Sequence, residues 1–138
     1  MNFEEEIKKG FIRKVKPDSQ RAQSLEKSSQ QALQTAKSIP LNENSSKTVF
    51  RELYESLRQF CESLGYSKGY KFNNHESITS FLDEVLKEKD NSLKFDRYRK
   101  IRNGINYYGD TIDISTVKEA LKDIPKIIDK IKRLFDKQ

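Results

Sequence analysis

Five side chains with binding chemistry lie close together in the stretch YRKIRNGINYYGD. Arg102 offers a planar fork of hydrogen-bond donors that matches a phosphate group. Asn103 and Asn106 each add a donor and an acceptor, and Tyr107 and Tyr108 could stack on a nucleobase. Residues four apart share a helix face, so Arg102 and Asn106 are expected on one side. The cluster predicts a site for a nucleotide or for an RNA backbone.

Arg102 also has a purely structural interpretation. It falls on or beside an apolar stripe at helical spacing that consists of Phe95, Tyr98, Ile101 and Ile105. A charge at the edge of a core needs a partner, and Glu52 or Glu55 in RELYESL could reach it from another helix. A bidentate pair of this kind would make the charge tolerable. In that case Arg102 would be part of an internal ion pair in a structural or assembly protein.

Metal and cofactor chemistry has little support in the sequence. One histidine and one cysteine are too few for a zinc site. His75, in NNHES, is expected at a helix start as a surface or capping residue, and Cys61 lies on an apolar stripe as a small buried hydrophobe. There is no phosphate-binding loop, dinucleotide fingerprint or nucleophile elbow. We therefore predict no metal and no cofactor.

The elements that must position these residues read as helices throughout. Apolar periodicity predicts a short N-terminal amphipathic helix over 1–16, longer helices over 18–38, 45–64 and 93–108, a short helix over 73–87, and a last long helix from Thr116. Asp18 and an Asn73–Glu76 capping box mark starts, and Gly65 and Gly109 mark ends. Pro125 should kink or restart the last helix. No segment has convincing strand character.

Short loops between these helices predict an all-α, antiparallel four- to five-helix bundle over residues 18–138. Residues 1–17 form an amphipathic segment that either packs on this body or reaches a neighbouring subunit. Hydrophobic residues make up 34% of the 138 and charged residues 35%, with a net charge of +6, so an anionic partner or simply a Lys-rich surface is expected. No signal-peptide or membrane-spanning run is visible, which predicts a cytoplasmic protein.

The late helix and its motif resemble a HEPN domain, the all-helical family named for higher eukaryotes and prokaryotes nucleotide-binding. The family motif is Arg, a polar residue such as Asn, a few residues and then His, and this chain has Arg102-Asn103-Gly104-Ile105-Asn106-Tyr107. The preceding FDRYRKIRN and the earlier FRELYESLRQFCESLGYSKGYKFNNHESITSFL are also similar to the family. The resemblance covers roughly residues 18 to 135.

The resemblance implies a prokaryotic homodimer that binds RNA or a nucleotide. It also implies a toxin–antitoxin type of partnership with a minimal nucleotidyltransferase. In HEPN ribonucleases, Arg and His of two subunits cleave RNA without metal. Here Tyr107 stands in place of that histidine, and tyrosine is a poor general base at neutral pH. The expectation is therefore a binding module, with a metal-independent endoribonuclease using Arg102 and Tyr107 as the alternative.

Overall fold

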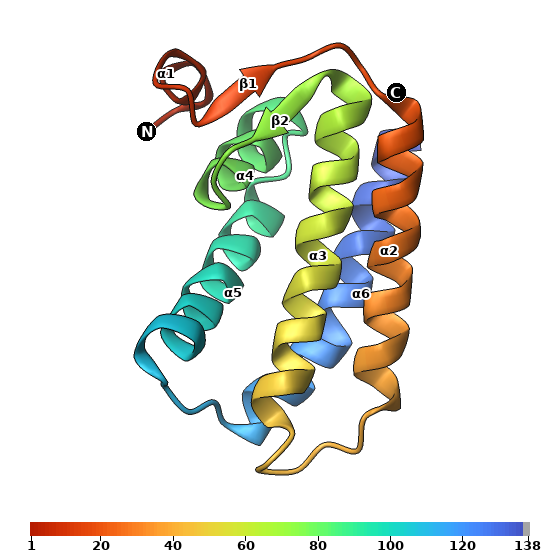
Figure 1. Ribbon diagram of the computed structural model, residues 1–138, viewed down its shortest axis with the longest axis vertical. Coiled ribbons are helices and arrows are strands. Elements are labelled where there is room, and N and C mark those ends of the chain that lie inside the picture. The colour runs from red at the N-terminus through yellow and green to blue at the C-terminus, as the bar shows by residue number, and fades with distance from the viewer. Residues whose placement is uncertain (137–138) are drawn as a thin grey trace.

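The computed structural model describes residues 1–136 and confirms an all-α helical bundle (Figure 1). One small antiparallel strand pair accompanies the helices. The elements in chain order are α1 (Phe3–Lys8), β1 (Ile12–Lys14), α2 (Ser19–Ser38), α3 (Ser46–Lys68), β2 (Tyr70–Phe72), α4 (Glu76–Ser80), the π-helical turn η1 (Phe81–Val85), α5 (Lys89–Tyr108) and α6 (Ile114–Asp136). None of the helices in this range combines the length and apolarity that crossing a membrane requires.

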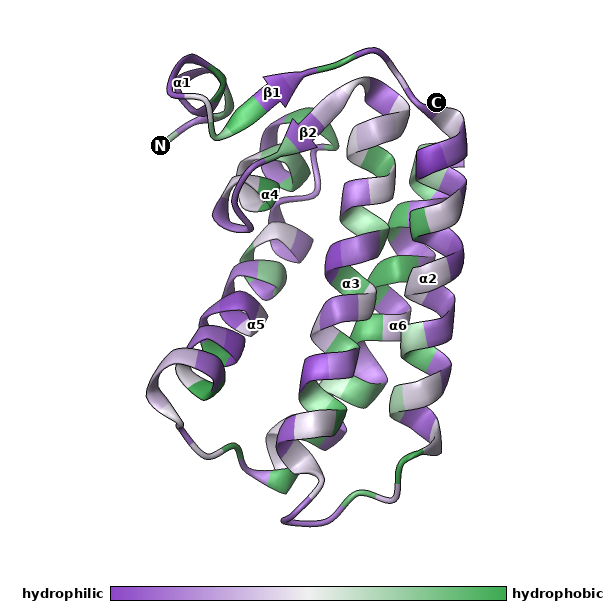
Figure 2. Ribbon diagram, in the orientation of Figure 1, coloured by the Kyte–Doolittle hydropathy of each residue, from purple (hydrophilic) through white to green (hydrophobic). Residues whose placement is uncertain are grey.

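Helix α3 is the centre of the bundle, with α2 and α6 on one side and α5 on the other (Figure 1). Its apolar stripe includes Val49, Phe50, Leu53 and Leu57, all fully buried. Hydrophobic segments of α3 and α6 lie where these helices meet α2 (Figure 2). The apolar face of α3 that the sequence predicts therefore forms part of the core.

The α2–α3 contact depends on small side chains. Helix α2 is capped by Asp18, which accepts a hydrogen bond from the backbone N–H of Arg21 at 3.0 Å, as its sequence predicts. Its buried face consists of Ala22, Ser29, Ala32 and Ala36. The Ser29 hydroxyl donates to the carbonyl of Ser56 at 2.6 Å, which is possible only because the two backbones come close together.

The N-terminal segment differs from the predicted helix over 1–16. Helix α1 ends at Lys8, Gly10 takes a left-handed φ of 82°, and β1 then pairs antiparallel with β2, with Ile12 opposite Phe72. Ile12 is only 1% exposed. The expectation that no strand would form was therefore wrong, and residues 1–17 pack on the main body of the same chain.

Helix α3 also runs past its predicted end. Gly65 lies inside the helix, and the left-handed residue that ends it is Gly69, with φ 89°. A Cβ on Gly65 would lie 2.5 Å from the ring of Phe72. This glycine therefore permits close packing of β2 against α3 and does not terminate the helix.

Three further boundaries differ from the sequence prediction. Asn74, rather than Asn73, accepts the capping hydrogen bond from Ser77 N–H at 2.9 Å. Helix α5 begins at Lys89, so most of the predicted turn EKDNS is helical. Helix α6 begins at Ile114 and continues through Pro125 without a restart. The predicted end of α5 at Gly109, with φ 65°, is confirmed.

Candidate functional site

A cleft of about 330 Å³ opens between the start of α4 and the C-terminal half of α5. We call it the Arg102 cleft. Its lining residues are polar, charged or aromatic: Asn74, His75, Glu76, Arg99, Arg102, Asn103 and Tyr107. The cleft therefore joins three residues of the predicted cluster to three residues that precede the start of α5 by more than ten positions, and to Arg99.

The Arg102 guanidinium lies close to two aromatic rings. Its central carbon is 5.7 Å from the ring centroid of Tyr54 and 5.9 Å from that of Tyr107, and it donates to Asn103 Oδ1 at 3.3 Å. Within residues 1–136, no carboxylate lies at ion-pair distance from Arg102. The positive charge of Arg102 is stabilised by the faces of these two rings and by the Asn103 amide oxygen. Guanidinium N–H groups therefore remain available to bind an anion.

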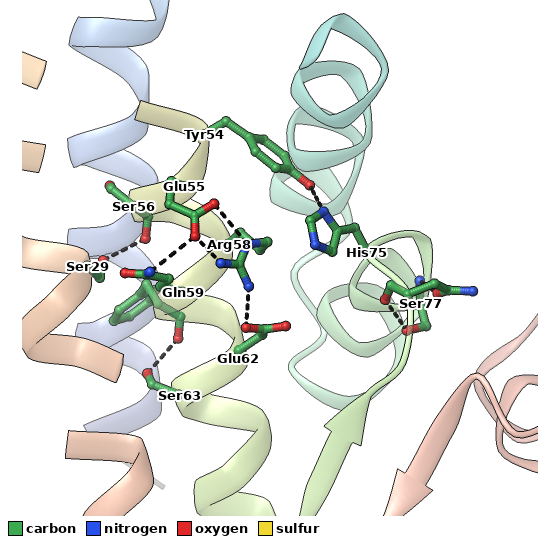
Figure 3. Close-up of polar contacts among 12 residues, drawn as sticks. Ser29, Tyr54, Glu55, Ser56, Arg58, Gln59, Glu62, Ser63, His75 and Ser77 are labelled. Atoms are coloured by element: carbon green, nitrogen blue, oxygen red, sulfur yellow. Dashed lines mark hydrogen bonds and ion pairs between the residues drawn. The ribbon is translucent and has the colours of Figure 1, made fainter. Parts of the chain in front are cut away.

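The predicted ion pair between Arg102 and Glu52 or Glu55 is not formed in this part of the chain. Glu55 instead pairs with Arg58 one turn along α3 and accepts from Gln59 at 3.1 Å, and Arg58 also bonds to Glu62 (Figure 3). Burial acts to raise the pKa of Glu55, but the hydrogen bond and charge of Arg58 outweigh it and hold that pKa below its ordinary value. Glu55 therefore pairs with Arg58 on its own helix and not with Arg102 on α5.

His75 is the main residue that the sequence interpretation missed. It occupies the N-cap position of α4, but its side chain makes no capping hydrogen bond there. Its Nδ1 lies 2.9 Å from the Tyr54 hydroxyl, and the two side chains point towards one another from α4 and α3 (Figure 3). His75 is thus neither a cap nor a freely exposed residue. Nothing in the sequence links positions 54, 75 and 102, which lie in α3, just before α4 and in α5.

The surroundings of His75 favour its neutral form. Burial, followed by the charges of Arg58 and Arg102, lowers the pKa of His75 to about 4, although Glu55 acts in the opposite direction. Tyr54 is 1% exposed, and burial raises the pKa of its hydroxyl far above the ordinary value despite the nearby arginines. At neutral pH, both partners of the 2.9 Å contact are therefore uncharged.

The predicted cluster on α5 is divided by the structure. Arg102, Asn103 and Tyr107 line the cleft. Asn106 instead accepts a hydrogen bond from Arg51 Nε at 2.7 Å, and Tyr108 is 81% exposed outside the lining. Arg102 and Asn106 are four residues apart on α5, but they do not share one site, because Arg51 of α3 donates a hydrogen bond to Asn106.

The other charged residues of the cleft are Arg99 and Glu76. Arg99 is paired with Asp96 through hydrogen bonds of 3.0 and 2.8 Å, so its charge is largely compensated. Glu76 is exposed at the rim. The site thus has one guanidinium without an acidic partner, a neutral imidazole and an asparagine amide, which together can bind an anion. Across residues 1–136, no group of three or more His, Cys, Asp or Glu side chains could hold a metal ion.

Comparison with known proteins identifies no relatives: no family model matches the chain, and neither a curated protein nor a solved structure matches it.

Proposed function

We propose that this protein is a HEPN-like module that binds RNA or a nucleotide, with Arg102 holding a phosphate group. The observation that carries the proposal is the state of Arg102, whose guanidinium lines a cleft without a carboxylate partner in residues 1–136. An arginine without a carboxylate partner can donate two parallel hydrogen bonds to a phosphate. Asn103 and the Tyr54 ring keep that donor in place.

Tyr107 adds a surface for a nucleobase. It lines the cleft, is 69% exposed and has its ring beside the Arg102 guanidinium. Stacking of a base on an exposed tyrosine next to a bound phosphate is a common arrangement in single-strand recognition. The net charge of +6 favours the approach of such a ligand.

Two further parts of the proposal concern partners. Tyr107 and Tyr108, both largely exposed at the end of α5, would be covered in a homodimer. A minimal nucleotidyltransferase, as a toxin–antitoxin type of partner, is proposed from the sequence resemblance alone. Light scattering of the purified protein, alone and with the product of a neighbouring reading frame, tests both parts. A monomer at all concentrations would contradict the homodimer.

Binding of a short single-stranded RNA to Arg102→Ala tests the main proposal. Loss of a charge-assisted phosphate contact should weaken binding by about tenfold or more and reduce the salt dependence. Arg97→Ala is the matched control, because Arg97 lies on the same helix but pairs with Glu119 at 3.1 Å away from the cleft. Equal affinity of the wild type and Arg102→Ala in fluorescence anisotropy would refute the site.

A metal-independent endoribonuclease is the second candidate. The specific observation that favours it is the presence of the chain's one histidine in the Arg102 cleft, from an element other than the motif helix. In this form of the hypothesis, His75 assists proton transfer beside a phosphate that Arg102 holds. Incubation of RNA with the protein in EDTA tests it, with His75→Ala and Arg102→Ala as inactive controls. RNA that stays intact with the wild type would exclude this candidate.

A further inference from the structure

The Tyr54–His75 contact determines which nitrogen of the imidazole is available to a ligand. Tyr54 is buried, and among residues 1–136 its hydroxyl has His75 Nδ1 as its hydrogen-bond partner. The hydrogen of a buried hydroxyl needs an acceptor. Because this hydroxyl keeps its proton, it donates to Nδ1, and the hydrogen of the neutral imidazole is then on Nε2.

The second ring nitrogen remains open to the cleft. Within residues 1–136, Nε2 of His75 has no hydrogen-bond partner, and the buried side-chain atoms that lack one are Ser56 Oγ and Gln59 Oε1. Nε2 is thus reachable by solvent. His75 and Arg102 line the same cleft, so this N–H and the guanidinium can serve one ligand.

We propose that His75 is a second binding residue of the Arg102 cleft and that Tyr54 is its positioning residue, which presents the neutral Nε2–H as a donor to an oxygen of a bound phosphate. This inference rests on the proposed function and adds to it a residue that lies outside α5, immediately before α4. It also favours binding over cleavage, because an imidazole with its hydrogen on Nε2 offers no lone pair to the cleft for taking up a proton.

The charges around His75 agree with a neutral donor. Arg58 and Glu55 face it from α3, Arg99 and Arg102 from α5, and Glu76 adjoins it on α4. Burial and the arginines oppose a positive charge on the ring, and Glu55 only partly offsets them. A neutral N–H in this place provides a hydrogen bond to an anion without another buried charge.

Tyr54 connects the two binding residues. Its hydroxyl bonds to His75, while its ring lies 5.7 Å from the Arg102 guanidinium carbon. A change in its rotamer would disturb both. Tyr54→Phe separates these roles, because it keeps the ring and removes only the hydroxyl.

Nitrogen-15 NMR of the imidazole tests the positioning role directly, since the chain has one histidine and gives one pair of ring signals. At neutral pH, we expect an unprotonated, hydrogen-bonded Nδ1 and a protonated Nε2. In Tyr54→Phe, the Nδ1 signal should move towards that of an unbonded nitrogen. Tyr98→Phe is the matched control, because its buried hydroxyl bonds to Asp123 at 3.2 Å instead. A proton on Nδ1 in the wild type would overturn the proposal.

Binding of a short oligouridylate tests the ligand role. We expect His75→Ala to weaken binding about tenfold, the loss of one hydrogen bond to a charged acceptor, and Tyr54→Phe to weaken it about threefold. His75→Gln keeps an N–H donor of similar reach and should recover part of the affinity. Circular dichroism confirms that each variant is folded.

The same titrations separate the two proposals. Binding that depends on Arg102 but is unchanged in both His75 variants would overturn this inference and leave the proposed function intact. Absence of binding by the wild type would overturn both. In that case, the NMR signals of the free protein would still report whether Tyr54 orients the ring.

Discussion

His75 illustrates how position alone gives a common residue unusual properties. An imidazole on a solvated surface titrates near 6.5, whereas here burial and the charges of Arg58 and Arg102 lower its pKa to about 4. The folded protein therefore binds the proton of this ring more weakly than the unfolded chain does. The difference makes folding stability depend on pH.

The sign of that dependence follows from linkage. Between pH 6.5 and about 4, the unfolded chain carries a proton on His75 that the folded protein lacks, so stability falls as the pH falls through this window. The loss attributable to His75 should reach at most about 3 kcal/mol. Urea unfolding at several pH values should show a smaller loss for His75→Gln than for the wild type.

The other titrating groups are present in both proteins, although the charge of His75 contributes to the lowered pKa of Glu55 and is lost with the histidine. Burial raises the pKa of Glu6 and Glu62, which changes stability in the opposite sense, but both residues are common to the two proteins. Identical pH profiles for the wild type and His75→Gln would contradict the lowered pKa. Above pH 6.5, the two proteins should differ by an amount that no longer depends on pH.

At the scale of elements, α3 positions most of the site. Its Tyr54 contacts both His75 and Arg102, and its Glu55–Arg58–Glu62 group lies beside the histidine (Figure 3). The far end of the same helix receives β2, where Phe72 packs on Gly65. Close packing at Gly65 thus helps to hold the segment that leads into α4 and His75.

Gly65→Ala should destabilise the protein. The new Cβ would lie 2.5 Å from the Phe72 ring and 3.2 Å from the Tyr70 carbonyl oxygen, and Phe72 is 8% exposed with little room to move. The cost of overpacking, about 1–3 kcal/mol, should exceed the gain in helix propensity of about 1 kcal/mol. Thermal and urea unfolding measure the difference.

Gly104→Ala is the matched control on α5. The nearest atoms to its new Cβ belong to the exposed Asp110 side chain, which can rotate away. We expect this variant to be unchanged or up to about 1 kcal/mol more stable. If Gly104→Ala were the more damaging of the two, the close approach at Gly65 would not be the determinant that we describe.

At the scale of the whole molecule, the N-terminal segment closes one end of the bundle. The β1–β2 pair lies above α4 and beside the upper end of α3 (Figure 1). Ile12 is 1% exposed within the core, and Asn73 donates to the Gly10 carbonyl at 2.7 Å. The first residues of the chain therefore restrain the loop that carries His75.

Ile12→Ala should destabilise the fold by about 2–4 kcal/mol, because it removes buried methyl groups from a closely packed place. Phe11→Ala is the control, since Phe11 is 37% exposed and should cost much less. Hydrogen exchange would also show faster opening of residues 70–75 in Ile12→Ala than in the control. Equal stability of both variants would indicate that the segment only lies on the surface.

The helices themselves were largely predictable, and so was part of the site. Apolar periodicity, the Asp18 cap and Gly109 are local signals, so α2, the main part of α3 and the end of α5 could be located from the sequence. Arg102, Asn103 and Tyr107 lie within one and a half turns of one helix, which brought them together in any all-α fold. That these residues bind RNA or a nucleotide stays a prediction.

The tertiary structure decided what depends on contacts between distant segments. Strands of three residues carry no usable periodicity, so β1 and β2 were recognisable only once paired. Glu55 had a neighbouring arginine on its own helix, so it did not need Arg102. His75 reached the cleft because α4 meets α5 beside Tyr54, and no local pattern encodes that angle. The sequence determined which faces are apolar, and packing decided which polar groups those faces bring together.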